Sequence, residues 1–127
     1  MPARRRIDPA DGVEAVHRWA AHEAAGQPGA PDRRTLATAV RYTLEELAAC
    51  APGRSVEVRV PPFGVTQAVA GAVHRRGTPP AVVETDAGTW LALATGRLSW
   101  HEAAAAGALR ASGERCVLSA YLPLLRG

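Results

Sequence analysis

The sequence predicts an α+β protein, with a mixed, mostly antiparallel sheet of four or five strands that helices cover on one face. Three observations lead to this prediction. Two segments with apolar residues at helical spacing occupy the first fifty residues, a strand hairpin follows, and the last third alternates strands with two short capped helices. A hairpin followed by strands that are joined through helices is typical of a two-layer α+β sandwich.

The front of the chain is predicted to form two helices. The first runs from about Pro9 to Ala25, because Asp8 can cap its first turn and proline is favoured at the first helical position. The segment Gly26–Pro31 is rich in glycine and proline and interrupts the helix. A second helix that ends before Pro52 is indicated by a second apolar stripe at helical spacing, made of Leu36, Val40, Thr43, Leu44 and Leu47.

A strand hairpin follows the helices. The segment Val56–Val60 alternates valine with charged residues, which is the pattern of a strand with one buried face. Pro61-Pro62 stops this strand, and Val65–Ala70 is predicted to be its antiparallel partner. We interpret Val73–Pro80 as a loop or an edge strand, because it is polar and interrupted by prolines.

Two short helices in the last third have clear start and stop signals. Asp86 can accept hydrogen bonds from the first turn of one helix, and Gly96 can adopt the left-handed conformation that ends it. Ser99 and Glu102 have the spacing of a capping box for the next helix, which Gly107 closes.

Strands flank these two helices. Val82–Thr85 is predicted to be the strand before them and Leu109–Ser112 the strand after them. A closing helix is predicted to begin near Glu114 and to be ended or bent by Pro123. Its apolar side would consist of Val117, Leu118, Tyr121, Leu122 and Leu125.

The length of 127 residues predicts a single domain. Within it we expect a flexible basic tail (1–7), N-terminal helices (8–51), and the sheet with the C-terminal helices (54–127). No segment has the roughly 20 apolar residues of a membrane span, and no apolar segment of a secretion signal follows the first arginines. Cys50 and Cys116 lack metal-site spacing, so we expect free, buried thiols and a cytoplasmic protein.

The net charge of +3 raises the question of nucleic-acid binding. All basic residues other than histidine are arginine, which together with the abundant alanine is typical of a GC-rich bacterial genome. The clusters Arg4–Arg6, Arg33-Arg34 and Arg75-Arg76 are short and lack interleaved aromatic residues. We therefore expect solvated faces, Glu45-Glu46 among them, and no specific nucleic-acid partner; binding through the arginine tail stays as a minor alternative.

The sequence contains no recognisable catalytic or metal-binding arrangement. His17 and His22 are five residues apart, about 140° around a helix, which does not suit one metal ion. His74 and His101 have no further ligand at metal-site spacing. The serine nucleophile motif and a glycine-rich phosphate loop are both missing. We expect a protein that is not an enzyme and uses no cofactor or metal.

The last third resembles the helix, helix and strand core of the sterol carrier protein family, type-two-like, and is nearest to its small actinobacterial members. The likeness extends over roughly Ser55–Leu125, and Val73–Pro80 lies where the family usually has another strand. The family likeness implies non-catalytic binding or transfer of a fatty acyl or sterol-like lipid, between the sheet and its helices. The pattern that carries it is Asp86…Leu91-x-Leu93-x-x-Gly96-x-Leu98…Ala103…Gly107-x-Leu109-x-x-Ser112-Gly113.

Eight apolar residues are the candidates for lining such a pocket: Phe63, Trp90, Leu93, Leu98, Trp100, Leu118, Tyr121 and Leu122. In sequence, pocket and core residues look the same. The alternative is therefore a filled core in a regulatory or protein-interaction module, related to the accessory domains of mycothiol-dependent isomerases. Such a module would act on a protein partner or as a homodimer, and an exposed apolar patch would favour it.

Overall fold

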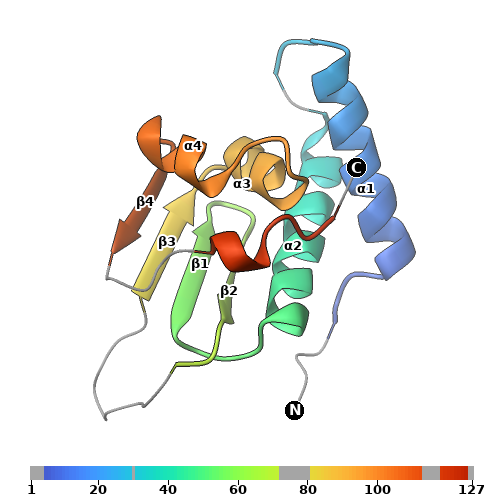
Figure 1. Cartoon of the computed structure of the whole chain (residues 1–127). Coiled ribbons are helices and arrows are strands. Elements are labelled where there is room, and N and C mark those ends of the chain that lie inside the picture. The colour runs from blue at the N-terminus through green and yellow to red at the C-terminus, as the bar shows by residue number, and fades with distance from the viewer. Residues whose placement is uncertain (1–4, 30, 72–80, 113–117, 126–127) are drawn as a thin grey trace.

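The computed structural model describes residues 5–29, 31–71, 81–112 and 118–125 (Figure 1). Along the chain these residues form α1 (Pro9–Ala24), α2 (Arg33–Cys50), β1 (Val56–Val60), β2 (Gly64–Ala68), β3 (Ala81–Thr85), α3 (Ala87–Ala94), α4 (Trp100–Ala105), β4 (Leu109–Ser112) and a 3-10 turn, η1 (Ser119–Tyr121). The predicted segment Val73–Pro80 lies outside the described residues.

The four strands form one mixed sheet in the order β2-β1-β3-β4. The pairs β1–β2 and β3–β4 are antiparallel, and β1 runs parallel to β3. In the register, Val58 lies beside Thr66 on one side and Val83 on the other. This confirms the predicted α+β class and the mixed, mostly antiparallel sheet, with strands β2 and β4 at its edges.

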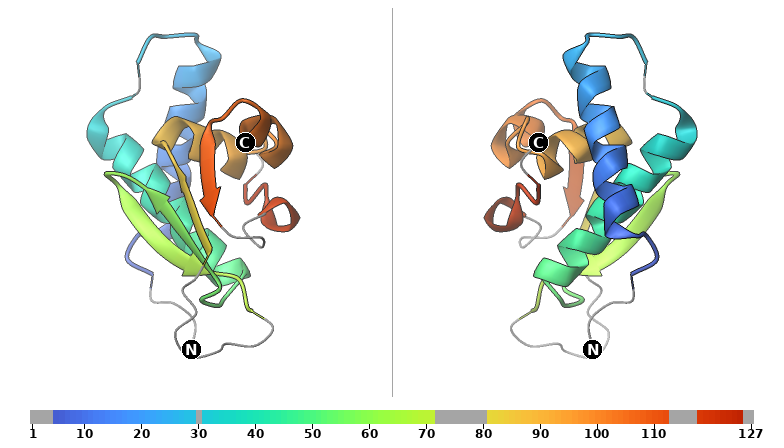
Figure 2. Two further views of the ribbon diagram at one scale, coloured as in Figure 1. Left: turned by 90° about the vertical axis from the view of Figure 1, so that its left-hand side faces the viewer. Right: turned by 90° about the vertical axis from the view of Figure 1, so that its right-hand side faces the viewer.

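Helix α2 lies between the sheet and α1, with α3 beside it (Figure 1). The same layering is visible when the molecule is turned to either side (Figure 2). The three valines of β1 are completely buried, which is what their alternation with charged residues predicts. The largest fully buried side chains of the core come from α1, α2, β1, β3, α3 and the segment after β4, and include Val16, Val40, Leu47, Val58, Val83, Trp90, Leu91 and Leu118.

Side-chain caps set the helix starts. Asp8, Asp32 and Asp86 accept hydrogen bonds from backbone N–H groups in the first turns of α1, α2 and α3. Ser99 and Glu102 form the predicted capping box of α4. The helix-ending glycines Gly96 and Gly107 have positive φ angles, as predicted.

The prediction of a closing helix that begins near Glu114 is wrong for the described residues. After Leu118 the chain forms only the short 3-10 turn η1, and Leu122 is extended, with φ −111° and ψ 143°. Pro123 explains this, because proline lacks a backbone N–H and disfavours the helical conformation of the residue before it. The predicted start of this helix and Cys116 lie outside the described residues.

Cys50 is free, as predicted, but it is exposed at the end of α2 and not buried. Within the described part of the chain, no helix combines the length and apolar character needed to cross a membrane.

Candidate functional site

Three of the eight candidate pocket residues belong to the filled interior. Trp90, Leu93 and Leu118 are at most 1% exposed. The indole Nε1 of Trp90 donates a hydrogen bond of 2.8 Å to the Oγ1 of Thr43. The protein therefore both surrounds the ring and accepts the hydrogen bond of its polar atom.

Four further candidates are half-buried near the end of the chain. Trp100, Tyr121 and Leu122 pack against the buried core, and Leu98 is half-buried in the turn between α3 and α4. The C-terminal segment is held by backbone hydrogen bonds from Leu124 and Leu125 to the carbonyl oxygen of Ala94, at 2.9 and 3.0 Å.

Phe63 lines a pocket at the edge of the sheet, and none of the other seven candidates is in its lining. We call this pocket the Phe63 pocket. It has a volume of about 390 Å³ and lies beside the edge strand β2, where the hairpin meets α2 and the chain before α1. Its lining residues are Arg6, Ile7, Arg41, Leu44, Glu45, Ala48, Phe63, Gly64, Val65 and Thr66.

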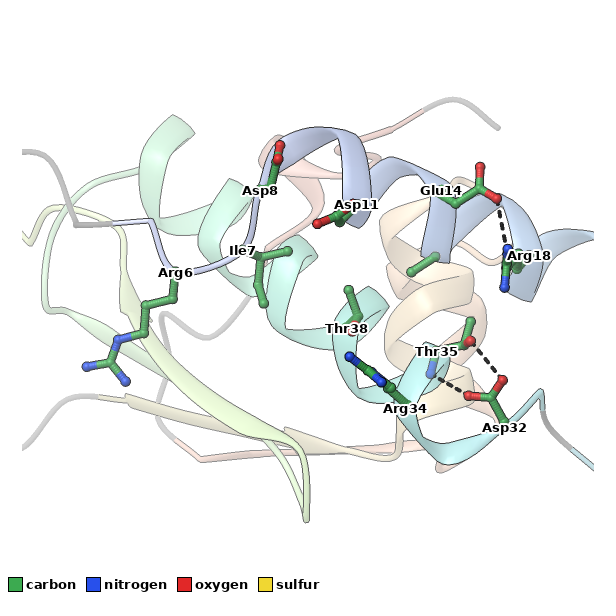
Figure 3. Close-up of a pocket in the computed structure, with 11 residues that line it drawn as sticks. Arg6, Ile7, Asp8, Asp11, Glu14, Arg18, Asp32, Arg34, Thr35 and Thr38 are labelled. Atoms are coloured by element: carbon green, nitrogen blue, oxygen red, sulfur yellow. Dashed lines mark hydrogen bonds and ion pairs between the residues drawn. The ribbon is translucent and has the colours of Figure 1, made fainter.

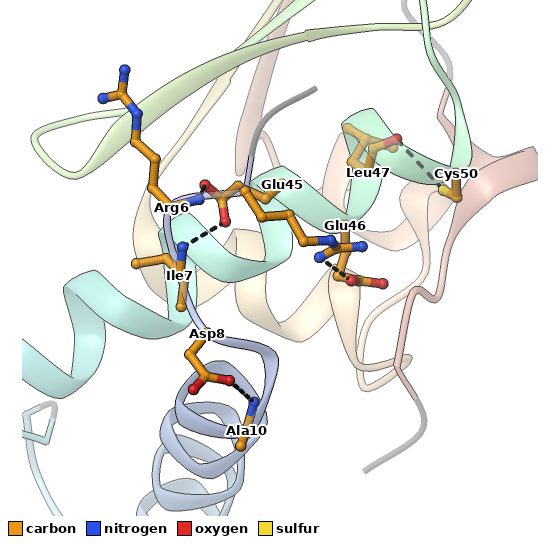
Figure 4. Close-up of polar contacts among 9 residues, drawn as sticks. Arg6, Ile7, Asp8, Ala10, Glu45, Glu46, Leu47 and Cys50 are labelled. Atoms are coloured by element: carbon orange, nitrogen blue, oxygen red, sulfur yellow. Dashed lines mark hydrogen bonds and ion pairs between the residues drawn. The ribbon is translucent and has the colours of Figure 1, made fainter. Parts of the chain in front are cut away.

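One wall is the segment Arg5–Ile7, which we call the N-terminal strap. The backbone N–H groups of Arg6 and Ile7 donate to the two carboxylate oxygens of Glu45, at 2.8 and 3.1 Å (Figure 4). Arg5 forms an ion pair of 2.5 Å with Glu46. The expectation of a solvated Glu45-Glu46 face is therefore wrong: both residues are half-buried and hold the strap, which belongs to the segment expected to be a flexible tail.

The opposite wall is the hairpin turn, which α2 fixes through two arginines. The Nε of Arg41 donates a hydrogen bond of 2.9 Å to the carbonyl oxygen of Phe63. The guanidinium of Arg33 lies 5.6 Å from the centroid of the Phe63 ring, within cation–π distance. At the base, a side chain on Gly64 would lie 3.2 Å from Leu44, so glycine keeps the hairpin close to the helix.

The charge at this pocket is mainly positive. The side chains of Arg6, Arg33 and Arg41 are exposed, and no carboxylate among the described residues forms an ion pair with them. Glu45 is the one acidic lining residue, and backbone N–H groups already occupy both of its oxygens. Val65, 59% exposed, adds an apolar surface at the rim.

A second groove, of about 550 Å³, lies between α1 and α2 (Figure 3). Its lining carries both signs of charge, including Glu14 and Arg18, which pair at 3.1 Å. Asp32 lies at its end, where hydrogen bonds from the backbone N–H and side chain of Thr35 lower the pKa of this carboxyl. This mixed, polar lining does not suit an apolar ligand.

Across the described residues, no group of three or more His, Cys, Asp or Glu side chains is placed to bind a metal ion. His17 and His101 are exposed, His22 is half-buried, and His74 lies outside the described residues. Phe63 is a candidate from the sequence, whereas Ile7, Arg41 and Leu44, which line the same pocket, are not. The pocket joins three segments that are distant in the sequence, and no local pattern indicates that they lie close together.

The comparison with known families covers most of the chain. The family described as bacterial SCP ortholog matches residues 32–124, well over half of the 127 residues. The match begins at Asp32, the N-cap of α2, so it includes a helix that the likeness seen in the sequence left out. No curated protein matches this chain. The chain belongs to the family of bacterial SCP orthologues, and so to the proteins related to sterol carrier protein.

Proposed function

We propose that the protein is a non-catalytic carrier or sensor of an apolar ligand, a fatty acyl or sterol-like lipid, which binds in the Phe63 pocket. The observation that carries this proposal is an open pocket of about 390 Å³ between the sheet edge and α2, in a chain of a sterol-carrier-like family. This volume lies within the range of small-molecule sites, roughly 300 to 1,000 Å³.

The lining of the pocket supports binding through apolar contact. Ile7, Phe63 and Val65 supply apolar surface, and Leu44 and Ala48, which are 3% and 7% exposed, lie beneath them at the α2 wall. Each methylene group removed from water contributes about 0.8 kcal/mol. An acyl chain with eight buried methylenes would gain about 6 kcal/mol before the cost of immobilisation, so no dedicated polar motif is needed.

The second candidate function is a protein-interaction module with a filled core. The complete burial of Trp90, Leu93 and Leu118 supports it, because these side chains are surrounded by other protein atoms and expose no surface to a ligand. The exposed Val65 on the edge strand β2 would then belong to the contact surface. A partner protein or a second copy of the chain would bind there.

Two measurements test the proposal. Native mass spectrometry of protein purified from a bacterial host would detect a lipid that is released on denaturation. Delipidated protein would then be titrated with dodecanoate, with the rise in melting temperature as the readout. A one-to-one adduct or a saturable rise in melting temperature supports ligand binding. The absence of both would support the interaction module.

The variants Phe63→Ala and Trp100→Ala locate the site. Each removes one half-buried aromatic ring, but Phe63 lines the pocket and Trp100 lies at the start of α4. Phe63→Ala is expected to abolish the ligand-induced rise in melting temperature, and Trp100→Ala to lower the melting temperature while keeping the rise. The opposite result would move the site to the C-terminal segment.

A further inference from the structure

We infer that the Phe63 pocket selects amphiphiles with an anionic head group, a carboxylate or a phosphate ester on an acyl chain, and that the guanidinium groups of Arg6 and Arg41 bind this head group. The inference rests on the proposed function and narrows it, because a sterol has no anionic group. It follows from the charge, the geometry and the hydrogen bonding of the arginines around the pocket.

The arginines at this pocket differ from those that are paired elsewhere. Arg18 and Arg59 form ion pairs with glutamates on their own elements, and Arg5 pairs with Glu46. Arg6 and Arg41 have no such partner among the described residues, although both line the pocket. Two positive charges therefore border the apolar surface, against the single negative charge of Glu45, which forms no ion pair with either arginine.

Arg41 is held in place for this role. Its Nε donates to the carbonyl oxygen of Phe63, which fixes the side chain between α2 and the hairpin turn. A guanidinium has five N–H donors, so those on the two terminal nitrogens stay available. Such a fork can bind two oxygens of a carboxylate or phosphate at once.

Arg6 contributes through its side chain alone. Its backbone N–H is bonded to Glu45, whereas its side chain points away from Glu45 and Glu46 (Figure 4). The Glu45 carboxylate therefore holds the backbone of the strap and leaves the Arg6 guanidinium free for a ligand. Ile7, the next residue, places an apolar side chain in the same pocket.

The arrangement matches an amphiphile in which the polar and apolar parts are adjacent. The acyl chain would lie on Leu44, Ala48 and Phe63, and the anionic head group would lie at the two arginines. Hydrogen bonds to a charged group are stronger than those between neutral groups, so the head group would contribute affinity as well as orientation.

The test compares three ligands with the same chain: dodecanoate, its neutral methyl ester and dodecyl phosphate. Delipidated full-length protein would be titrated with each by calorimetry. We expect dodecanoate or dodecyl phosphate to bind about tenfold or more tightly than the ester, as one charged hydrogen bond allows. The tighter of the two anions identifies the head group as carboxylate or phosphate.

Three variants assign the effect to the pocket. Arg6→Gln removes a charge without touching the backbone bond to Glu45, and Arg41→Gln removes the second charge. Arg6→Gln is expected to weaken binding of the preferred anion about tenfold and to leave binding of the methyl ester unchanged. Arg41→Gln also loses the hydrogen bond to the carbonyl oxygen of Phe63, so it is expected to weaken binding of the anion more than binding of the ester. Arg34→Gln, on the same helix but outside the pocket, is the control and is expected to change neither affinity.

The outcomes separate the two proposals. Equal binding of the ester and both anions, unchanged in Arg6→Gln and Arg41→Gln, would overturn the head-group inference and leave the proposed function standing. No binding of any of the three ligands would overturn the proposed function itself. An equal loss of affinity in Arg34→Gln would show general electrostatic attraction and also overturn the assignment to the pocket.

Discussion

Trp90 and Thr43 join α3 to α2 through a hydrogen bond of 2.8 Å between the indole Nε1 and the threonine Oγ1. The Oγ1 also lies 2.8 Å from the carbonyl oxygen of Ala39 and 2.9 Å from that of Val40. A hydroxyl has one hydrogen to donate and can accept as well, so Thr43 donates to its own helix and accepts from Trp90. Both residues are completely buried.

Replacing Thr43 by valine is expected to destabilise the protein by about 1–3 kcal/mol, because the buried indole N–H loses its acceptor while the shape of the side chain is nearly kept. Chemical denaturation measures the change. In a double-mutant cycle with Trp90→Phe, the second substitution is expected to cost less in the Thr43→Val background than in the wild type. Strictly additive effects would contradict a direct coupling of the two side chains.

Two glycine-to-alanine substitutions are expected to have opposite effects. A side chain at Gly12 would overlap the ring of Tyr42 where α1 packs on α2, so Gly12→Ala is expected to cost about 1–3 kcal/mol. A side chain at Gly88, in α3, would meet only the carboxylate of Asp86 at 3.5 Å. Gly88→Ala is expected to stabilise the protein by up to about 1 kcal/mol. Equal changes in the unfolding midpoint would contradict the tight helix contact.

Removing the Glu45 carboxylate is expected to release the N-terminal strap. In Glu45→Ala, the backbone N–H groups of Arg6 and Ile7 lose their acceptors, so their protection from hydrogen exchange is expected to fall. Glu14→Ala, which removes an exposed carboxylate of α1, is the control and is expected to leave the strap unchanged. Unchanged exchange in Glu45→Ala would mean that these bonds do not hold the strap in solution.

The stability of α2 is expected to depend on pH through Asp32. Its pKa is lowered in the folded protein by hydrogen bonds from Thr35, below the value of about 3.9 of an unfolded aspartate. The charged form therefore favours folding above about pH 3.9, and this contribution is lost as the pH falls through the folded pKa. Asparagine can also cap a helix but does not titrate. The stability difference between wild type and Asp32→Asn is therefore expected to shrink on acidification, and a difference independent of pH would contradict this.

Cys50 is expected to react slowly with alkylating reagents despite its exposure. Partial burial of the thiol raises its pKa, and the negative charge of Glu46 raises it further, so the thiolate is scarce near pH 8. In a Cys116→Ser background, the alkylation rate of the folded protein at pH 8 is expected to be below that of the same cysteine in the unfolded chain. Glu46→Gln is expected to increase the rate in part. A rate equal to that in the unfolded chain would contradict the shift.

Local signals in the sequence predicted most of the fold. The capping residues Asp8, Asp86 and Ser99, and the alternation in Val56–Val60, each act within a few residues, so no knowledge of the tertiary structure was needed. The closing helix was predicted wrongly because the apolar spacing around Tyr121 suits a helix while Pro123 prevents one. The two signals conflicted, and the proline decided the outcome.

The candidate site was less predictable, for a physical reason. Apolar residues such as Trp90 serve a core and a pocket equally well, and only packing distinguishes the two uses. Glu45 looked like a surface carboxylate because its partners, the N–H groups of the strap, are backbone groups far away in the sequence. Contacts between a side chain and a distant backbone group do not affect the periodicity of apolar residues or the spacing of motifs in the sequence.

The position of α2 between α1 and the sheet has an evolutionary consequence. Along the middle of this helix, residues 39–48, Arg41 is the single exposed side chain. Every other position in that stretch is buried or half-buried. Packing therefore limits which residues can occupy these positions in homologous chains. Arg41 is exposed and has one structural contact, its hydrogen bond to the carbonyl oxygen of Phe63. If it binds a head group as we propose, the residues that replace it in related chains are expected to vary with the ligand.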